Sequence, residues 1–214
     1  MTTKAVVFDL GNVLDIQDDP GPWLARRERM AGHLGLTGHA LWELFYHSES
    51  WELVKRGKIT NPEYWDRVLS PLGLTDRKAQ TAFVAELFEG RDQIHPSMRD
   101  LLHQLKSHYR LGLLSNTYEP DLETWLENRD LGEIFDVVVS SAKVGLAKPE
   151  PAIYRLTLER LGLPPEEVLF VDDLNRNTLA AEALGIHCIV FQSPAQLRAE
   201  LKRRGILVEQ ASKP

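Results

Sequence analysis

The stretch AVVFDLGN, residues 5–12, decides the fold of this chain. Its first four residues are apolar and mostly β-branched or aromatic, which is typical of a strand that is buried on both faces. The strand ends at a carboxylate, Asp9, and the pair Gly11-Asn12 favours a tight turn directly after it. The pattern therefore predicts a buried strand that delivers an acid to its own carboxyl end.

Four other apolar runs resemble the first one, and amphipathic stretches of helical period lie between the later runs. One such stretch, residues 151–162, begins with Pro151 and ends with Gly162, as helix ends favour. Alternating strands and helices predict an α/β fold with a Rossmann-like core built on a mainly parallel sheet. The five predicted strands are residues 4–10, 111–116, 135–141, 167–173 and 187–192.

One long interval breaks this alternation. Residues 16–90 contain no convincing strand pattern, but they contain four helical patterns and four of the five tryptophans. We therefore expect an all-helical cap domain at residues 16–90, inserted into an α/β core made of residues 1–15 and 91–214. The last residues, 208–214, are expected to form a loose tail. The predicted cap helices are residues 22–35, 39–49, 61–73 and 77–90.

Composition and charge limit the classes of partner. The chain has 214 residues and a formal net charge of -6, so nucleic acids and anionic membranes would meet no general attraction. No apolar run approaches the roughly 18 residues of a membrane span. The single cysteine, Cys188, excludes an intramolecular disulfide and is expected to be a small buried hydrophobe. We expect a cytoplasmic protein, either a monomer or a homodimer, without nucleic-acid or membrane partners.

Polar side chains stand at the carboxyl ends of four predicted strands, and in a parallel sheet these ends share one edge. Three of them are carboxylates, and like charges at close range cannot all stay ionised without compensation. Oxygen ligands without histidine or cysteine favour Mg²⁺ over Zn²⁺. Either the pKa values of these carboxylates rise or a divalent cation binds there, and in the second case the sequence predicts a magnesium site at this edge. The polar ends are Asp9, residues 115–117, Ser140-Ser141 and Asp172-Asp173.

A site for an anion is predicted beside these carboxylates. Ser115 and Asn116 offer a hydroxyl and amide donors of the kind that hold a phosphoryl oxygen. Lys148 lies in a loop rich in glycine and proline, just before a predicted helix, and Pro149 keeps it out of helical geometry. Next to three acids, this lysine is expected to balance charge.

Four motifs of this chain resemble the sequential motifs of the haloacid dehalogenase-like hydrolase superfamily. They are FDLGNVL, LLSNT, KVGLAKPEPAIY and FVDDLNRNTLAAEALG, and they follow one another in that order. Each motif alone is weak, but four in order are highly specific. The match spans the core, with a helical cap after the first motif, and DLGNV is shared with sugar-phosphate phosphatases such as glucose-1-phosphate phosphatase.

The resemblance implies a Mg²⁺-dependent phosphatase that acts on a small phosphorylated metabolite, a sugar phosphate among the candidates. Asp9 would be the nucleophile and form an aspartyl-phosphate intermediate. Ser115 would bind the transferring phosphoryl group with help from the backbone N–H of Asn116. Lys148 would neutralise that group and Asp9.

The same resemblance implies a metal site. Asp9, Asp173 and the backbone carbonyl of Gly11 would hold Mg²⁺. Asp172 would bind the ion directly or through water. Asn177 would orient the lysine or a metal-bound water.

Gly11 departs from the phosphatase pattern, which places an acid two residues after the nucleophile to protonate the leaving oxygen and then activate water. Three explanations stand: a substrate with a good leaving group such as a sugar 1-phosphate, an acid from elsewhere, or a weakly active module that binds a phosphorylated metabolite. The first is preferred. Candidates for the substitute acid are Asp15, Asp18, Asp19, His33 and His47.

A metal-independent 2-haloacid dehalogenase is the alternative enzyme, because a halide leaves without a proton. In the dehalogenase pattern, small polar residues stand where this chain has Asp172-Asp173. Such a pair of acids beside Asp9 would repel an anionic substrate unless a metal is present. The phosphatase is therefore favoured. Candidate cap residues that contact the substrate are Trp23, Tyr46, His47 and Trp51.

Overall fold

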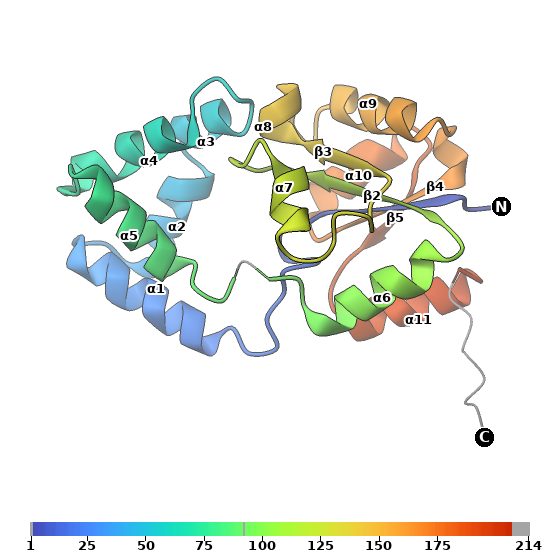
Figure 1. The fold of residues 1–214 in the computed structure, drawn as a ribbon, viewed down its shortest axis with the longest axis horizontal. Helices are drawn as coiled ribbons and strands as arrows, with labels where there is room; N and C mark the ends of the chain where they lie inside the picture. Colours follow the sequence, from blue (N-terminus) through green and yellow to red (C-terminus); the bar gives the residue numbers. More distant parts are fainter. Residues whose placement is uncertain (1, 92, 207–214) are drawn as a thin grey trace.

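The computed structural model describes residues 2–91 and 93–206, and a five-stranded parallel sheet forms the centre of its α/β part (Figure 1). The strand order is β3-β2-β1-β4-β5, so the first strand is central. All five predicted strands are confirmed; four are shorter than predicted, and β2 begins and ends one residue earlier. The predicted tail at residues 208–214 lies outside the described residues. The strands are β1 (Ala5–Phe8), β2 (Arg110–Ser115), β3 (Val137–Ser140), β4 (Val168–Asp172) and β5 (His187–Val190).

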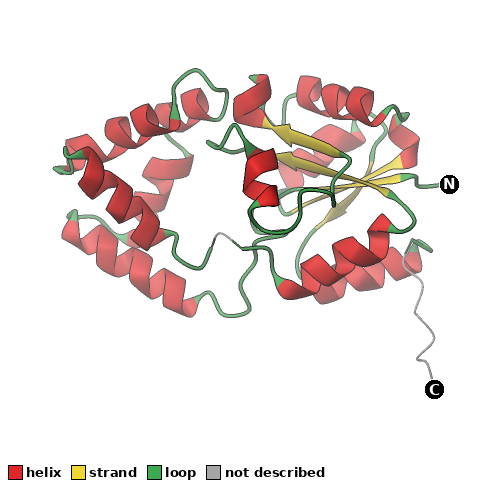
Figure 2. Cartoon of the chain, viewed as in Figure 1, coloured by secondary structure: helices red, strands yellow, loops and turns green. Residues whose placement is uncertain are grey.

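Helices cover both faces of this sheet, as Figure 2 shows. Along β1, Val6 and Phe8 pack into one apolar cluster, whereas Ala5 and Val7 pack into the other. This alternation follows from the period of two along a strand and confirms the predicted α/β class. The first cluster includes α6 (Pro96–Lys106), α7 (Leu122–Glu127) and α11 (Pro194–Arg203), and the second includes α9 (Pro151–Leu161) and α10 (Asn175–Glu182).

A third apolar cluster holds together the helices between β1 and α6, which lie beside the carboxyl ends of the strands (Figure 1). Trp51 and Trp65 are buried in it, and Tyr118 from the loop after β2 packs against it. Within residues 16–90 the structure describes no strand, as expected, while the boundaries of a cap domain stay a prediction. The helices are α1 (Gly21–His33), α2 (Gly38–Tyr46), α3 (Glu49–Val54), α4 (Asn61–Leu69) and α5 (Arg77–Leu87).

The loop after α3 touches the α/β part at α8 (Ser141–Val144), a short helix after β3. A Cβ atom added to Gly57 would lie 2.2 Å from the carbonyl oxygen of Ala142, and Gly57 has a φ of +62°. Arg56 pairs with Glu52 in α3 and with Glu150, which stands just before α9. A glycine and an arginine therefore fix the loop against the core.

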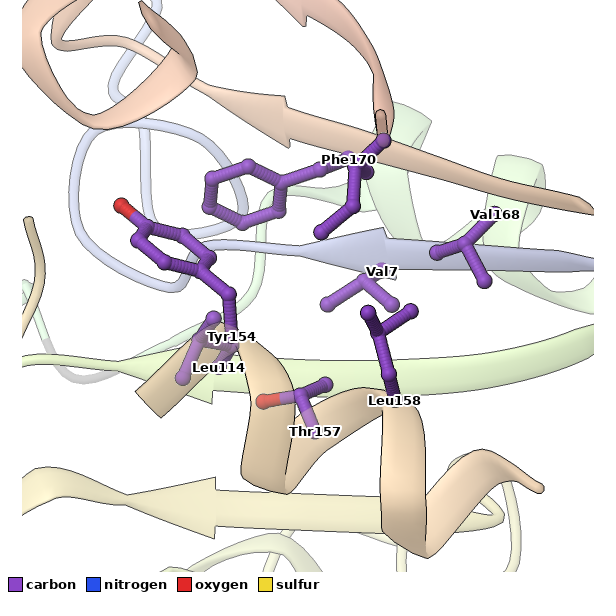
Figure 3. Close-up of a pocket in the computed structure, with 8 residues that line it drawn as sticks. Val7, Leu114, Tyr154, Thr157, Leu158, Val168 and Phe170 are labelled. Carbon is purple, nitrogen blue, oxygen red and sulfur yellow. The ribbon is translucent and has the colours of Figure 1, made fainter. Parts of the chain in front are cut away.

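A small cavity lies between the sheet and α9 (Figure 3). Apolar side chains such as Val7, Leu114 and Phe170 form most of its wall. Its two hydroxyl groups are already used, because Tyr154 donates to the carbonyl of Asn177 and Thr157 donates to the carbonyl of Ile153. The cavity therefore offers no polar group for a charged ligand, and we interpret it as a packing defect.

The single thiol is buried as expected. Cys188 in β5 is 8% exposed, and burial raises its pKa to about 12. Because the thiolate is the reactive form, folded protein at pH 8 should react with iodoacetamide far more slowly than protein unfolded in urea. Mass spectrometry of time points measures both rates. Equal rates in the folded and unfolded protein would contradict the described burial.

A basic run, residues 202–204, lies at the end of α11, where Arg203 and Arg204 pair with Glu200. Among the described residues, no helix combines the length and the apolar character that crossing a membrane requires.

Candidate active site

Three carboxylates meet at the carboxyl ends of β1 and β4. These strands are neighbours, with Phe8 opposite Val171, so Asp9 and Asp172 leave the sheet side by side. Oxygen atoms of Asp9, Asp172 and Asp173 lie within 4.8 Å of one another. The strand order reverses between β1 and β4, and such a reversal is where open α/β sheets bind ligands.

Lys148 lies between two of these carboxylates. Its Nζ atom is 2.8 Å from Oδ1 of Asp9 and 2.7 Å from Oδ2 of Asp172, and its side chain is 1% exposed. The side chain of Asn116 holds the backbone of this lysine through two hydrogen bonds, each 2.9 Å long. The Asn116 amide therefore positions Lys148 with one of its two N–H donors, and its contact with a phosphoryl oxygen stays a prediction. The role of the Asn116 backbone N–H stays a prediction.

The charges of this cluster are not balanced by the protein alone. Burial and the nearby charges of Asp172 and Asp173 raise the pKa of Asp9 to about 8, although Lys148 acts in the opposite direction. Burial and the charge of Asp172 also raise the pKa of Asp173. For Lys148, burial lowers the pKa, but the two carboxylates outweigh it and the net shift is upward. One lysine thus faces three acids, and a divalent cation would supply the missing charge.

Asp172 is held by donors from the protein. Asn177 donates to both of its oxygens, at 2.9 and 3.1 Å, and the backbone N–H of Leu174 donates to Oδ1 at 2.9 Å. With Lys148 on Oδ2, three donor groups orient this carboxylate through four hydrogen bonds, whereas Asp9 and Asp173 have fewer protein partners. The buried Oδ1 atom of Asn177 has no partner and could accept a hydrogen bond from a metal-bound water. The donor set therefore fits Mg²⁺.

Two residues that were not among the predicted site residues lie beside the carboxylate cluster. Asn12 has a φ of 56°, which asparagine tolerates better than most residues, and its Nδ2 donates to Asp173 at 3.3 Å. Arg91 donates to Oδ1 of Asn12 at 3.1 Å, and its guanidinium lies 4.5 Å from the ring centroid of Trp23. The Gly11-Asn12 turn signal pointed to Asn12, but nothing in the sequence placed Arg91 here.

The serines at the strand ends play different parts. Ser115 is buried as the last residue of β2, opposite Ser140 in β3, and its role in phosphate binding stays a prediction. Ser140 donates to the carbonyl of Glu119 at 2.6 Å, and Ser141 accepts from the N–H of Thr117 at 2.9 Å. These two serines therefore stabilise the loop after β2.

Of the five candidates for a substitute acid, one lies at the turn that follows Asp9 and four do not. Asp15 accepts a hydrogen bond from the backbone of Asn12, in the turn that follows Asp9. The others are turned toward different neighbours or toward solvent. Asp18 lies 3.0 Å from His95 with its side chain 92% exposed, Asp19 caps Gly21, His33 is exposed at the end of α1, and His47 lies near Glu43.

Comparison with known families decides where this chain belongs. The model of the haloacid dehalogenase-like hydrolase family matches residues 3–185. The chain belongs to this family. The haloacid dehalogenase-like fold expected from the four motifs is thereby confirmed, and the acids Asp9, Asp172 and Asp173 all lie within the matched region.

Individual relatives support the assignment of this chain to the haloacid dehalogenase-like hydrolase family. A phosphoglycolate phosphatase from Yersinia pseudotuberculosis is 31% identical over 195 residues, which cover 87% of this chain and 79% of that protein. A haloacid dehalogenase family enzyme from Bacteroides thetaiotaomicron, crystallised with magnesium and inorganic phosphate, has a TM-score of 0.68 and 25% identity, covering 89% and 94% of the two chains. In three other curated relatives the matched segment spans 36%, 19% and 55% of the relative's length.

The fold alone does not distinguish the chemistries of this family. A 2-haloacid dehalogenase from Pseudomonas syringae pv. Tomato is superimposed with a TM-score of 0.62 at 20% identity, covering 95% of this chain and all of that one. That likeness concerns the fold only. The reaction has to be argued from the side chains at the site.

Proposed function

We propose that this hydrolase is a Mg²⁺-dependent phosphatase that acts on a small phosphorylated metabolite through an aspartyl-phosphate on Asp9. The observation that carries the proposal is the buried cluster in which Asp9, Asp172 and Asp173 face a single lysine, Lys148. Such a cluster is suited to a divalent cation and, through that cation, to an anionic phosphoester. The magnesium and phosphate of the Bacteroides thetaiotaomicron enzyme support the same chemistry.

Each residue has a defined task in this proposal. Asp9 attacks phosphorus, and Lys148 stabilises the charge that develops on the phosphoryl oxygens. Ser115 and the backbone N–H of Asn116 position the phosphoryl group. Phosphoryl transfer demands mostly positioning and charge neutralisation, which a rigid buried cluster provides.

The metal would be held by Asp9, Asp173 and the carbonyl of Gly11. Asp172 would act directly or through water, and Asn177 would orient a water with its free Oδ1 atom. When bound, Mg²⁺ would neutralise negative charge on the carboxylates and on the substrate phosphate.

The relatives guide the choice of substrate class. Phosphatases of small metabolites occur among the relatives, and phosphoglycolate and sugar phosphates are the first candidates. We further propose a cytoplasmic enzyme, acting as a monomer or a homodimer. Trp23, Trp51 and Tyr46 take part in one aromatic network near the core and stay candidates for substrate contact.

A panel of phosphate esters tests the proposal. Phosphate release should require Mg²⁺ and should stop with EDTA, with phosphoglycolate, glucose 1-phosphate and p-nitrophenyl phosphate as first substrates. Chloride release from 2-chloropropionate without metal would instead support the dehalogenase. Saturable binding of a phosphorylated metabolite without any turnover would support the binding module.

A further inference from the structure

An alcohol is a poor leaving group as an alkoxide, so cleavage of an alkyl phosphate benefits from a group that supplies a proton. The structure leaves room for such a group near the nucleophile. A Cβ atom added to Gly11 would meet no other atom within 4 Å. An acid reaching this space from another position would meet the chemical need.

The turn after β1 brings one carboxylate toward that space. The N–H groups of Leu14 and Asp15 both donate to the carbonyl of Leu10, at 2.9 and 3.2 Å, so residues 11–14 form one hydrogen-bonded turn, in which Asn12 has a φ of 56°. Asp15 follows this turn, and its carboxylate accepts a hydrogen bond from the backbone N–H of Asn12, the residue next to Gly11.

The carboxylate of Asp15 is held beside the peptide bond between Gly11 and Asn12. Its Oδ1 atom accepts a hydrogen bond from the backbone N–H of Asn12 at 2.5 Å. The Asn12 side chain in turn donates to Asp173 at 3.3 Å, so two hydrogen bonds connect Asp15 to the carboxylate cluster. The Asp15 side chain is 18% exposed, which leaves it reachable from solvent.

We propose that Asp15 is the general acid and base that replaces the side chain missing at Gly11, an inference that rests on the proposed phosphatase function. As an acid, Asp15 gives its proton to the ester oxygen while Asp9 bonds to phosphorus and the ester P–O bond breaks. The alcohol leaves. As a carboxylate, Asp15 then takes a proton from the water whose oxygen attacks phosphorus. The bond to Asp9 breaks, inorganic phosphate leaves, and both carboxyl groups return to their starting states.

The surroundings of Asp15 suit both roles. Arg91 lies 3.8 Å away, and Asp173, Tyr46 and Tyr118 are the other titratable groups that face it. Burial raises the pKa of Asp15, Arg91 opposes that shift, and Asp173 adds to it. A carboxyl group with a raised pKa is a better proton donor near neutral pH than an ordinary aspartate.

The test compares Asp15→Asn with Asp18→Asn, an exposed neighbour that pairs with His95. With an alkyl phosphate that the enzyme turns over, Asp15→Asn should lower kcat by about 10²–10³-fold, while Asp18→Asn should stay within about twofold. With 2,4-dinitrophenyl phosphate, whose leaving group needs no proton, Asp15→Asn should release one equivalent of dinitrophenol in a burst. The aspartyl-phosphate then accumulates because its hydrolysis lacks a base.

A second variant guards against a purely structural effect. Gly11→Asp, combined with Asp15→Asn in one chain, introduces a carboxylate into the open space. This double variant should have at least tenfold more alkyl phosphatase activity than Asp15→Asn alone. Equal losses on both substrates without a burst, or no loss at all, would overturn the role of Asp15. Absence of phosphate release by the unmodified enzyme from every ester would instead overturn the proposed function, and Asp15 would lose its role with it.

Discussion

Asp9→Asn is expected to lower phosphate release by about four orders of magnitude or more, because the amide cannot form the covalent intermediate. The substitution keeps the shape of the side chain, so loss of folding should not explain the result. Rapid acid quench with a ³²P-labelled substrate should trap phosphate on the unmodified protein and none on the variant. A variant that keeps a tenth of the activity would rule out Asp9 as the nucleophile.

The same substitution should have the opposite effect on stability. Asp9 has a pKa of about 8 in the folded protein against an ordinary value of 3.8, so between these values the folded state binds more protons than the unfolded state. Stability without metal should therefore fall as the pH rises from about 4 to about 8. Asp9→Asn should flatten this pH dependence and raise the urea midpoint at pH 8 in EDTA. An unchanged pH dependence would show that Asp9 is not strained in the apo protein.

Lys148→Met is the second variant with a large expected effect. Among the described residues, Lys148 is the one cation that pairs with the buried carboxylates of Asp9 and Asp172, so its removal should lower the free energy of unfolding at pH 8 in EDTA by about 3–5 kcal/mol. Phosphatase activity should also be lost, since no charge remains to stabilise the transferring phosphoryl group. Urea unfolding followed by tryptophan fluorescence measures the stability.

A matched lysine gives the control for this variant. Lys143 pairs with Glu123 at 2.8 Å, but its side chain is 51% exposed, so Lys143→Met should cost less than about 1 kcal/mol. Mg²⁺ should restore part of the stability of Lys148→Met and leave Lys143→Met nearly unchanged. Equal losses of stability in both variants, or no stabilisation of either variant by Mg²⁺, would contradict the inference that the carboxylate cluster carries uncompensated negative charge.

Much of this arrangement could be predicted because strands and their ends have local signals. The run before Asp9 and the run before Asp172 are both β-branched and apolar, and parallel pairing places their ends at one edge. The carboxylate cluster follows from those two facts. Pro149 indicated that Lys148 does not start the next helix, and the structure places this lysine among the acids.

The contacts that the sequence did not reveal depend on pairs far apart in the chain. Asn116 and Lys148 are 32 residues apart, and only the folded structure shows that the side-chain amide of Asn116 forms hydrogen bonds with the backbone of Lys148. Arg91 reaches the site through Asn12, 79 residues earlier. The helices α3 and α8, with six and four residues, are too short to give a periodic pattern.

The contact between Gly57 and Ala142 has a consequence for how this protein can diverge. Because any side chain at position 57 would collide with a backbone oxygen, a substitution there has to be accompanied by a shift of the loop after α3 or of α8. Residues 55–58 and residues 141–145 should therefore change together among orthologues, although Gly57 and Ala142 are 85 positions apart in the sequence. A chimera that joins the helical segment of this protein to the core of another protein would need both residues 55–58 and residues 141–145 to keep this contact.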